Sequence, residues 1–134
     1  MNETFVQKSI IAWLKNKRYR ITRDTYQLFG VDIKAYNYAG ERYYIECKGE
    51  TKGENSCLDF CTGLGQLFLR MNKKIEPRVH YGFGLPRTRH FERQYEKFLK
   101  LPLKLRKSLK IRFLFVDEKG KITEIKSWIN FKKQ

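Results

Sequence analysis

The stretch YYIECKGE, residues 43–50, decides how this chain is expected to fold. Aromatic and β-branched side chains of this kind are typical of a β-strand. Because successive side chains of a strand point to opposite faces, Glu46 and Lys48 share one face, while the apolar residues, Cys47 among them, share the other. The stretch therefore predicts a strand that buries one face in the core and presents two opposite charges on the other.

A second extended segment, VDIKAYNY, begins at Val31 and ends just before the tripeptide AGE that starts at Ala39. A glycine between two such segments favours a β-hairpin. Asp32 lies an even number of positions before Glu46, so both carboxylates can project from the same face if the strands pair across Ala39. We therefore expect Asp32, Glu46 and Lys48 to converge.

The rest of the chain alternates helices and strands. Apolar residues from Val6 to Leu14 recur at the spacing of one helical face, which predicts a helix over residues 4–17. The order favours an α/β fold with a mixed central β-sheet flanked by helices, in one domain spanning residues 1–134. The other predicted elements are a short strand over 19–23, a loop over 24–30, a helix over 56–72, a strand over 78–86, helices over 89–99 and 103–108, and a closing pair of strands around an EKG turn.

The chain is strongly basic. It has 134 residues, the usual size of one domain, and its formal net charge is +15 at pH 7. Such a charge destabilises the compact state through self-repulsion and is typical of proteins that bind a polyanion. Nucleic acid is the partner that this balance favours, although a merely solubilising surface would give the same count.

The sequence gives no sign of membrane insertion or secretion. No apolar run approaches the ~20 residues that cross a membrane, and charges interrupt the hydrophobic residues near the N-terminus. Three cysteines, Cys47, Cys57 and Cys61, lack the spacing of a disulfide framework. We expect a reducing, cytoplasmic setting, no membrane contact and no small-molecule cofactor.

The three charged residues suggest chemistry. Two carboxylates held close together repel each other unless a cation lies between them. Oxygen ligands of this kind suit Mg²⁺ or Mn²⁺, which accept substrate phosphate oxygens and lower the pKa of bound water. Lys48 could then orient or deprotonate the attacking water, or stabilise the charge that develops on the phosphate. Asp32, Glu46 and Lys48 together therefore predict a nuclease.

The residues resemble a known family. Asp32 followed by Glu46-Cys47-Lys48 is similar to the D…(D/E)xK signature of the PD-(D/E)XK nuclease superfamily, which includes restriction endonucleases and archaeal Holliday junction resolvases. The resemblance implies a restriction-endonuclease-like αβββαβ core, with metal bound by Asp32, Glu46 and the backbone carbonyl of Cys47. It also implies that Glu3 in the preceding helix is a further catalytic residue and metal ligand, and that Gln66 in the following helix is catalytic.

The sequence departs from the family pattern at two points. Val31 stands where the proline that names the motif is expected. Archaeal resolvases are similar to this chain in size, basicity and helix-first order, but typically carry a serine in the loop before the aspartate. Here that loop offers Thr22, Thr25 and Tyr26 instead. Junction resolution is therefore a narrower hypothesis than the nuclease core.

Structural alternatives exist for each candidate. A Glu-x-Lys pair on a strand is often only a solvated ion pair, worth ~0.2–1 kcal/mol. Glu3 could merely be an acidic residue that the helix dipole favours in a first helical turn, and Gln66 could lie on a polar helix face. Cys57 and Cys61, with two histidines elsewhere, invite a zinc site, but neither histidine has ligand spacing, and we expect none.

Cations concentrate between Arg70 and Lys110, where they outnumber the acidic residues. Spread over helices and loops, they predict a surface that follows a phosphate backbone with salt-dependent affinity and without base-specific reading. The candidate nucleic-acid-binding residues are Arg23, Lys52, Arg70, Lys73, Lys74, Arg87, Arg89 and Arg93.

The sequence therefore predicts a Mg²⁺- or Mn²⁺-dependent endonuclease that hydrolyses phosphodiester bonds of DNA. A homodimer is expected because cutting two strands takes two active sites. Two alternatives stay open: a basic nucleic-acid-binding protein whose nuclease core does not cut, and an RNA-directed nuclease.

Overall fold

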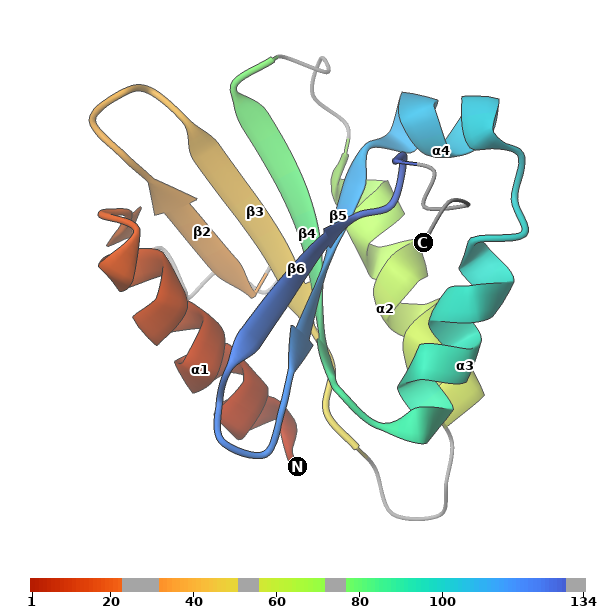
Figure 1. The fold of residues 1–134 in the computed structure, drawn as a ribbon. Helices are drawn as coiled ribbons and strands as arrows, with labels where there is room; N and C mark the ends of the chain where they lie inside the picture. Colours follow the sequence, from red (N-terminus) through yellow and green to blue (C-terminus); the bar gives the residue numbers. More distant parts are fainter. Residues whose placement is uncertain (23–31, 51–55, 72–76, 130–134) are drawn as a thin grey trace.

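The structure, a computed structural model, describes residues 1–22, 32–50, 56–71 and 77–129, and its fold is drawn in Figure 1. The helices are α1 (Glu3–Asn16), α2 (Ser56–Arg70), α3 (Arg89–Phe98) and α4 (Leu103–Leu109), and the strands are β1 (Arg20–Ile21), β2 (Ile33–Tyr36), β3 (Arg42–Cys47), β4 (Val79–Pro86), β5 (Ile111–Val116) and β6 (Ile122–Lys126). The predicted order of elements is confirmed. Residues 24–30, predicted as a loop, lie outside the described part of the chain.

The six described strands form one mixed sheet in the order β1-β2-β3-β4-β5-β6. The central strands β3, β4 and β5 are parallel, while the pairs β1·β2, β2·β3 and β5·β6 are antiparallel. Parallel pairs need a crossover connection, and here α2 joins β3 to β4 while α3 and α4 join β4 to β5. The predicted α/β fold with a mixed sheet flanked by helices is therefore confirmed.

Helix α1 covers one face of the sheet (Figure 1). Its Val6, Ile10 and Leu14 are fully buried and belong to one core cluster with Ile45 and Cys47 of β3. The spacing of the three helical residues places them on one face, as the periodicity predicts. The apolar face of β3 therefore packs on α1, which leaves its charged face for the opposite side.

The opposite face of the sheet carries α2 and α3 over a mostly aromatic core (Figure 1). Phe83 of β4 and Phe113 of β5 are fully buried there, and the ring of Phe60 in α2 contacts both, with centroids 5.4 Å and 6.0 Å away. Burying large aromatic side chains supplies much of the free energy of folding in small domains. This core holds α2 against the charged face of β3.

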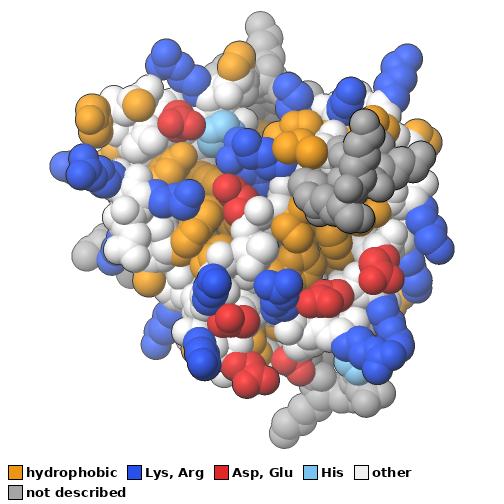
Figure 2. Space-filling model, in the orientation of Figure 1, with side chains coloured by type: hydrophobic (Ala, Val, Ile, Leu, Met, Phe, Trp, Pro, Cys, Tyr) orange, Lys and Arg blue, Asp and Glu red, His pale blue; other side chains and the backbone are white. Residues whose placement is uncertain are grey.

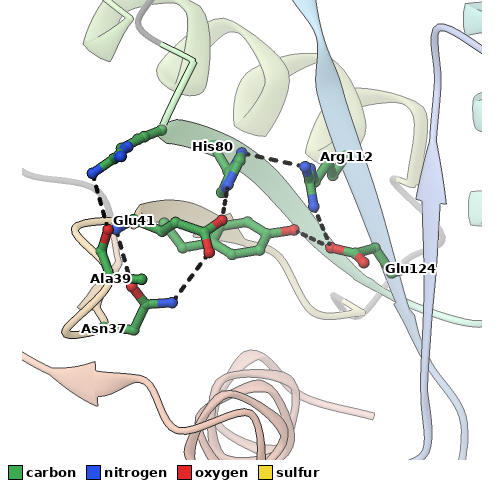
Figure 3. Close-up of polar contacts among 8 residues, drawn as sticks. Asn37, Ala39, Glu41, His80, Arg112 and Glu124 are labelled. Carbon is green, nitrogen blue, oxygen red and sulfur yellow. Dashed lines mark hydrogen bonds and ion pairs between the residues drawn. The ribbon is translucent and has the colours of Figure 1, made fainter.

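A polar network lies near the first residues of β4 and β5, away from Glu46 at the end of β3 (Figure 3). Arg112 donates to Glu124 (3.3 Å) and to Nδ1 of His80 (3.2 Å), and the hydroxyl of Tyr43 donates to Glu124 (2.8 Å). Because arginine is always protonated, Nδ1 of His80 must accept, so the ring proton sits on Nε2, which lies 2.8 Å from Glu41. This hydrogen bond lowers the pKa of Glu41. The network therefore links strands β3, β4, β5 and β6.

The structure corrects one local prediction. Asp32 does not lie within the hairpin strand: it forms a bend one residue before β2, which runs only from Ile33 to Tyr36. The hairpin itself is confirmed, with Asn37–Glu41 as the turn and Gly40 at a φ of +85°, a backbone conformation that glycine adopts without strain. In the described part of the chain, no helix is both long and apolar enough to span a bilayer.

Candidate active site

Strand β3 holds Glu46 and Lys48 in the predicted alternation. Cys47 is fully buried on the α1 side, so its two neighbours face α2. The side chain of Glu46 is only 4% exposed, and Lys48 is half-buried just beyond the strand, where its backbone N–H donates to Gly84 of β4 (3.0 Å). The β3·β4 ladder therefore holds both charges rigidly.

Asp32 is brought to the same place from β2. Ile33 pairs with Ile45 in the antiparallel register, so Asp32 lies across from Glu46. Its Oδ2 accepts a hydrogen bond from the backbone N–H of Cys47 at 2.8 Å. The carboxyl of Asp32 is thus fixed by the strand that carries Glu46, and the predicted convergence of the two acids is present.

The two acids influence each other strongly. Burial raises the pKa of Glu46 to about 8, and both a hydrogen bond to Asp32 and repulsion from its charge add to that rise. Arg70 and Lys48 act in the opposite direction but do not outweigh the burial. A carboxyl pair that keeps a proton near neutral pH is one that a cation would stabilise in its fully ionised form.

One face of helix α2 lies over this site. Asp59, Gly63, Gln66 and Arg70 recur at helical spacing and so lie along one side of α2. A Cβ at Gly63 would come within 2.6 Å of the ring of Phe83 and 2.8 Å of Cγ of Lys48. The absent side chain of Gly63 therefore leaves the room in which Lys48 lies.

One side chain of this helical face contacts an acid directly. Nη1 of Arg70 donates to Oε1 of Glu46, and the Arg70 side chain is only 24% exposed. Gln66, one turn earlier, has a buried Oε1 with no hydrogen-bond partner among the described residues. A buried acceptor left unpaired is costly, so this amide oxygen is available for a cation or a water. The sequence candidate Gln66 therefore lies on the helical face that covers the site.

Glu3 lies at the rim of the site. A Cβ at Gly49 would be 2.1 Å from the backbone nitrogen of Glu3, and the N-terminal amine of Met1 contacts Glu50 at 3.2 Å. The start of α1 therefore packs on the segment that follows β3. Burial raises the pKa of Glu3, and the charge of Asp32 raises it further while Lys48 lowers it. Its side chain is nevertheless exposed, not turned to the buried side as its helical spacing suggests.

The donor set fits a hard divalent cation. Two adjacent carboxyl groups and one unpaired amide oxygen are oxygen ligands, and Mg²⁺ is usually held by one or two carboxylates together with waters and substrate phosphate oxygens. Across residues 1–22, 32–50, 56–71 and 77–129, no three His, Cys, Asp or Glu side chains form a metal cluster. The residues present therefore suit a cation that substrate helps to hold, not an all-protein cage.

The predicted nucleic-acid-binding residues fall into three groups. Arg89 and Arg93 are exposed on α3, and Arg87 is half-exposed after β4, beside Glu92 (3.3 Å). Arg70 points inward to Glu46 and is not on the outer surface. The other four, Arg23, Lys52, Lys73 and Lys74, lie outside the described residues. On the face shown in Figure 2, Lys and Arg side chains are scattered over the middle as well as the outline, and acidic side chains lie among them.

Sequence reasoning missed two features of this site. It assigned Arg70 to the phosphate-binding surface, and it gave Gly63 no part in the site. The spacing of Gly63, Gln66 and Arg70 on one helical face is a signal that could have found both, because Gln66 was already a candidate.

Comparison with known proteins supports the fold. No protein-family model and no curated protein matches the chain. Solved structures with the same fold include an fdxN element excision controlling factor protein from Anabaena variabilis, with 21% sequence identity and a TM-score of 0.57 over 90% of this chain and 96% of the other. An XisH family protein from Nostoc punctiforme is 18% identical, with a TM-score of 0.57 over 89% and 96%. Both identities are below 25%, so the likeness shows that this chain shares the fold of these two proteins.

Proposed function

We propose that this protein is a divalent-metal-dependent endonuclease that hydrolyses phosphodiester bonds of DNA. The observation that carries the proposal is the convergence of Asp32, Glu46 and Lys48: two carboxyl groups in hydrogen-bonding contact, with an ammonium group on the same strand face. Together with a restriction-endonuclease-like fold, this arrangement favours hydrolysis of a phosphodiester over a purely structural ion pair.

Each residue has a defined part in this proposal. Asp32 and Glu46 would hold Mg²⁺ or Mn²⁺, with the Gln66 amide oxygen and the backbone carbonyl of Cys47 as further candidates, and Glu3 at the rim. A bound divalent cation supplies charge neutralisation at the phosphate and an acidified water. Lys48, whose Cγ lies beside Gly63, would use its ammonium to orient the attacking water or stabilise the charge that develops on the phosphate oxygens.

Substrate binding would come from the basic surface. The exposed Arg89 and Arg93 on α3 can contact phosphates without reading bases. The likeness to the Anabaena fdxN element excision controlling factor protein supports DNA as the substrate class. Resolution of four-way junctions is the narrower version of this proposal.

A homodimer belongs to the same proposal, because two strands of a duplex are cut by two active sites. Sedimentation of the free protein would show a species of about twice 16.2 kDa if the dimer forms without DNA. A monomer that cuts only one strand would contradict this part and leave the nuclease proposal standing.

The proposal is tested by incubating linear, nicked and four-way DNA, and matching RNA, with Mg²⁺, Mn²⁺ or EDTA. We expect metal-dependent cleavage of DNA by the wild type and none by Asp32→Ala or Glu46→Ala. DNA retention without any product would favour the non-catalytic binding protein, and cleavage of RNA alone would favour the RNA-directed nuclease. Preferential cutting of the four-way substrate would support junction resolution.

A further inference from the structure

Arg70 occupies the place that a bound cation would need. It is the last residue of α2, and its Nη1 donates to Oε1 of Glu46, a carboxyl that is otherwise almost completely buried. The guanidinium is turned from solvent into the site, and only 24% of its side chain is exposed. An arginine held this way is not available to a phosphate on the protein surface.

The charge balance of the site explains why an arginine lies there. Glu46 is next to Asp32, and two buried acids without a compensating charge are unfavourable. The guanidinium supplies one positive charge from within the protein, and Lys48 adds a second nearby. A divalent cation would supply the same compensation, and it would use the same carboxylate oxygens.

A guanidinium and a metal ion cannot share one carboxylate at full strength, because both are attracted to the same lone pairs and repel each other. We propose that Arg70 is an internal placeholder cation: it holds Glu46 in position before metal binds, and metal binding transfers it from Glu46 to a phosphate of the substrate. The inference rests on the proposed function, because it takes Glu46 as a metal ligand. It makes Arg70 a positioning residue in the free protein and a substrate contact afterwards.

The chemistry of arginine suits the second half of this transfer. Its planar fork binds phosphate as well as carboxylate in a bidentate manner, so it can exchange one anion for the other without changing its own charge. Its Cα sits at the end of α2, one turn beyond Gln66, on the helical face that covers the acids. A released side chain there stays at the end of the helix that covers the acids.

A purely structural role makes a different prediction. If Arg70 only stabilises the fold, for example as a cation near the C-terminus of α2, its removal weakens the folded state and does not improve metal binding. A placeholder competes with metal, so its removal must make metal binding tighter. The sign of the change in Mn²⁺ affinity therefore separates the two roles.

The test is calorimetric titration of Mn²⁺ into the DNA-free protein. We expect Arg70→Gln to bind Mn²⁺ about tenfold more tightly than the wild type, equivalent to ~1.4 kcal/mol, and Arg70→Lys to lie between them. Arg20→Gln, which removes an exposed arginine of β1, is the matched control for a general loss of positive charge and should bind as the wild type does. Equal or weaker Mn²⁺ binding by Arg70→Gln would overturn the placeholder role.

A second measurement is made on the wild type, with Arg70→Lys used only to assign the signal, and covers the case in which Arg70→Gln does not fold. Arginine side-chain NMR should show one guanidinium signal, the one absent from Arg70→Lys, shifting on saturation with Mg²⁺ and again on addition of a DNA duplex. A signal unchanged by Mg²⁺ would refute the transfer. If the wild type binds Mn²⁺ through Asp32 and Glu46 but Arg70→Gln gains nothing, only the placeholder fails; if the wild type binds no Mn²⁺ at all, the proposed function fails with it.

Discussion

The backbone N–H of Cys47 donates to Oδ2 of Asp32 at 2.8 Å, and this bond joins the bend before β2 to the strand that carries Glu46. This hydrogen bond therefore orients the carboxyl of Asp32 through Cys47, the residue next to Glu46. The two acids are neighbours because of the strand register, and the bond sets the orientation of Asp32 within that register.

This bond gives a first prediction. Asp32→Asn can keep the hydrogen bond from Cys47 through its amide oxygen, but it loses the negative charge. We expect a folded protein whose thermal midpoint stays within a few degrees of the wild type and whose Mn²⁺ affinity falls at least about tenfold, since a charged ligand has become neutral. Parallel thermal melts and calorimetry would check this, and unchanged Mn²⁺ affinity would remove Asp32 from the metal site.

The pKa of Glu46 predicts how stability depends on pH in the absence of metal. Its value of about 8 in the folded protein lies above its ordinary value of 4.5, so the folded state binds more protons than the unfolded state between these two values. The contribution of Glu46 to the free energy of unfolding is therefore greatest at low pH and is lost as pH rises through about 8. We expect wild type to lose ~1–3 kcal/mol relative to Glu46→Gln between about pH 5 and pH 8.5, measured by urea unfolding in EDTA. Parallel stability curves for the two proteins would contradict this assignment.

Two glycines of α2 should respond oppositely to alanine. At Gly63 a methyl group would collide with Phe83 and Lys48, whereas at Gly65 nothing lies within 4 Å of an added Cβ. We expect Gly63→Ala to lose ~1–3 kcal/mol and most of the cleavage activity, because Lys48 must shift. Gly65→Ala should gain ~0.5–1 kcal/mol through helix propensity and keep its activity. Denaturation and cleavage assays on both variants would check this, and equal behaviour of the two would show that α2 does not pack closely on Lys48.

The network around Arg112 should contribute to stability and not to catalysis. Arg112→Leu takes a donor from His80 and leaves Glu124 with the Tyr43 hydroxyl but no compensating cation in a half-buried place, which we expect to cost ~1–3 kcal/mol. Arg87→Leu breaks an ion pair with Glu92 in which both side chains are about half exposed, and it should change the free energy of unfolding by less than ~1 kcal/mol. Urea unfolding measures both. A cleavage rate per folded molecule that falls with Arg112→Leu would instead connect this network to the active site.

The exposed arginines of α3 should act through phosphate contacts alone. Replacing Arg89 and Arg93 by glutamine should weaken binding equally on unrelated DNA sequences and reduce the slope of log affinity against log salt by ~0.9 for each lost contact. Lys8→Gln, at an exposed position of α1, is the control and should leave the slope unchanged. Fluorescence anisotropy over a range of salt concentrations measures this, and an unchanged slope in the double variant would place DNA on another surface.

Local patterns in the sequence were sufficient for much of the fold. Alternation in β3 correctly predicted that Cys47 faces the core while Glu46 and Lys48 face the other side, because the period of a strand depends only on the backbone. The glycine at position 40 and the apolar spacing of α1 were equally local signals. The meeting of Asp32 and Glu46 could be predicted because a hairpin converts an even separation into a shared face.

The partner of Arg70 could not be predicted in the same way. Arg70 and Glu46 are 24 residues apart, and their contact depends on how α2 rotates over the sheet as Phe60 and Leu67 are buried. A basic residue in a basic segment is expected to be solvated, so the composition predicted that the Arg70 side chain faces solvent. It faces Glu46 instead. The same holds for Asp32, whose bend before β2 is set by a bond to Cys47 and not by strand propensity.

The central claim is that Glu46 acts by its charge in metal-dependent cleavage of DNA. The most direct measurement is the single-turnover rate of plasmid cleavage in Mn²⁺ by wild type, Glu46→Gln and Glu50→Gln, at equal amounts of folded protein. Glu50 is the matched control, an exposed glutamate just beyond β3 whose side chain pairs with the N-terminal amine. We predict that wild type and Glu50→Gln cut at similar rates and that Glu46→Gln is slower by at least ~10²–10³-fold, the loss typical of removing a group that stabilises transition-state charge. Cleavage by Glu46→Gln at the wild-type rate, or no cleavage by the wild type, would contradict the account.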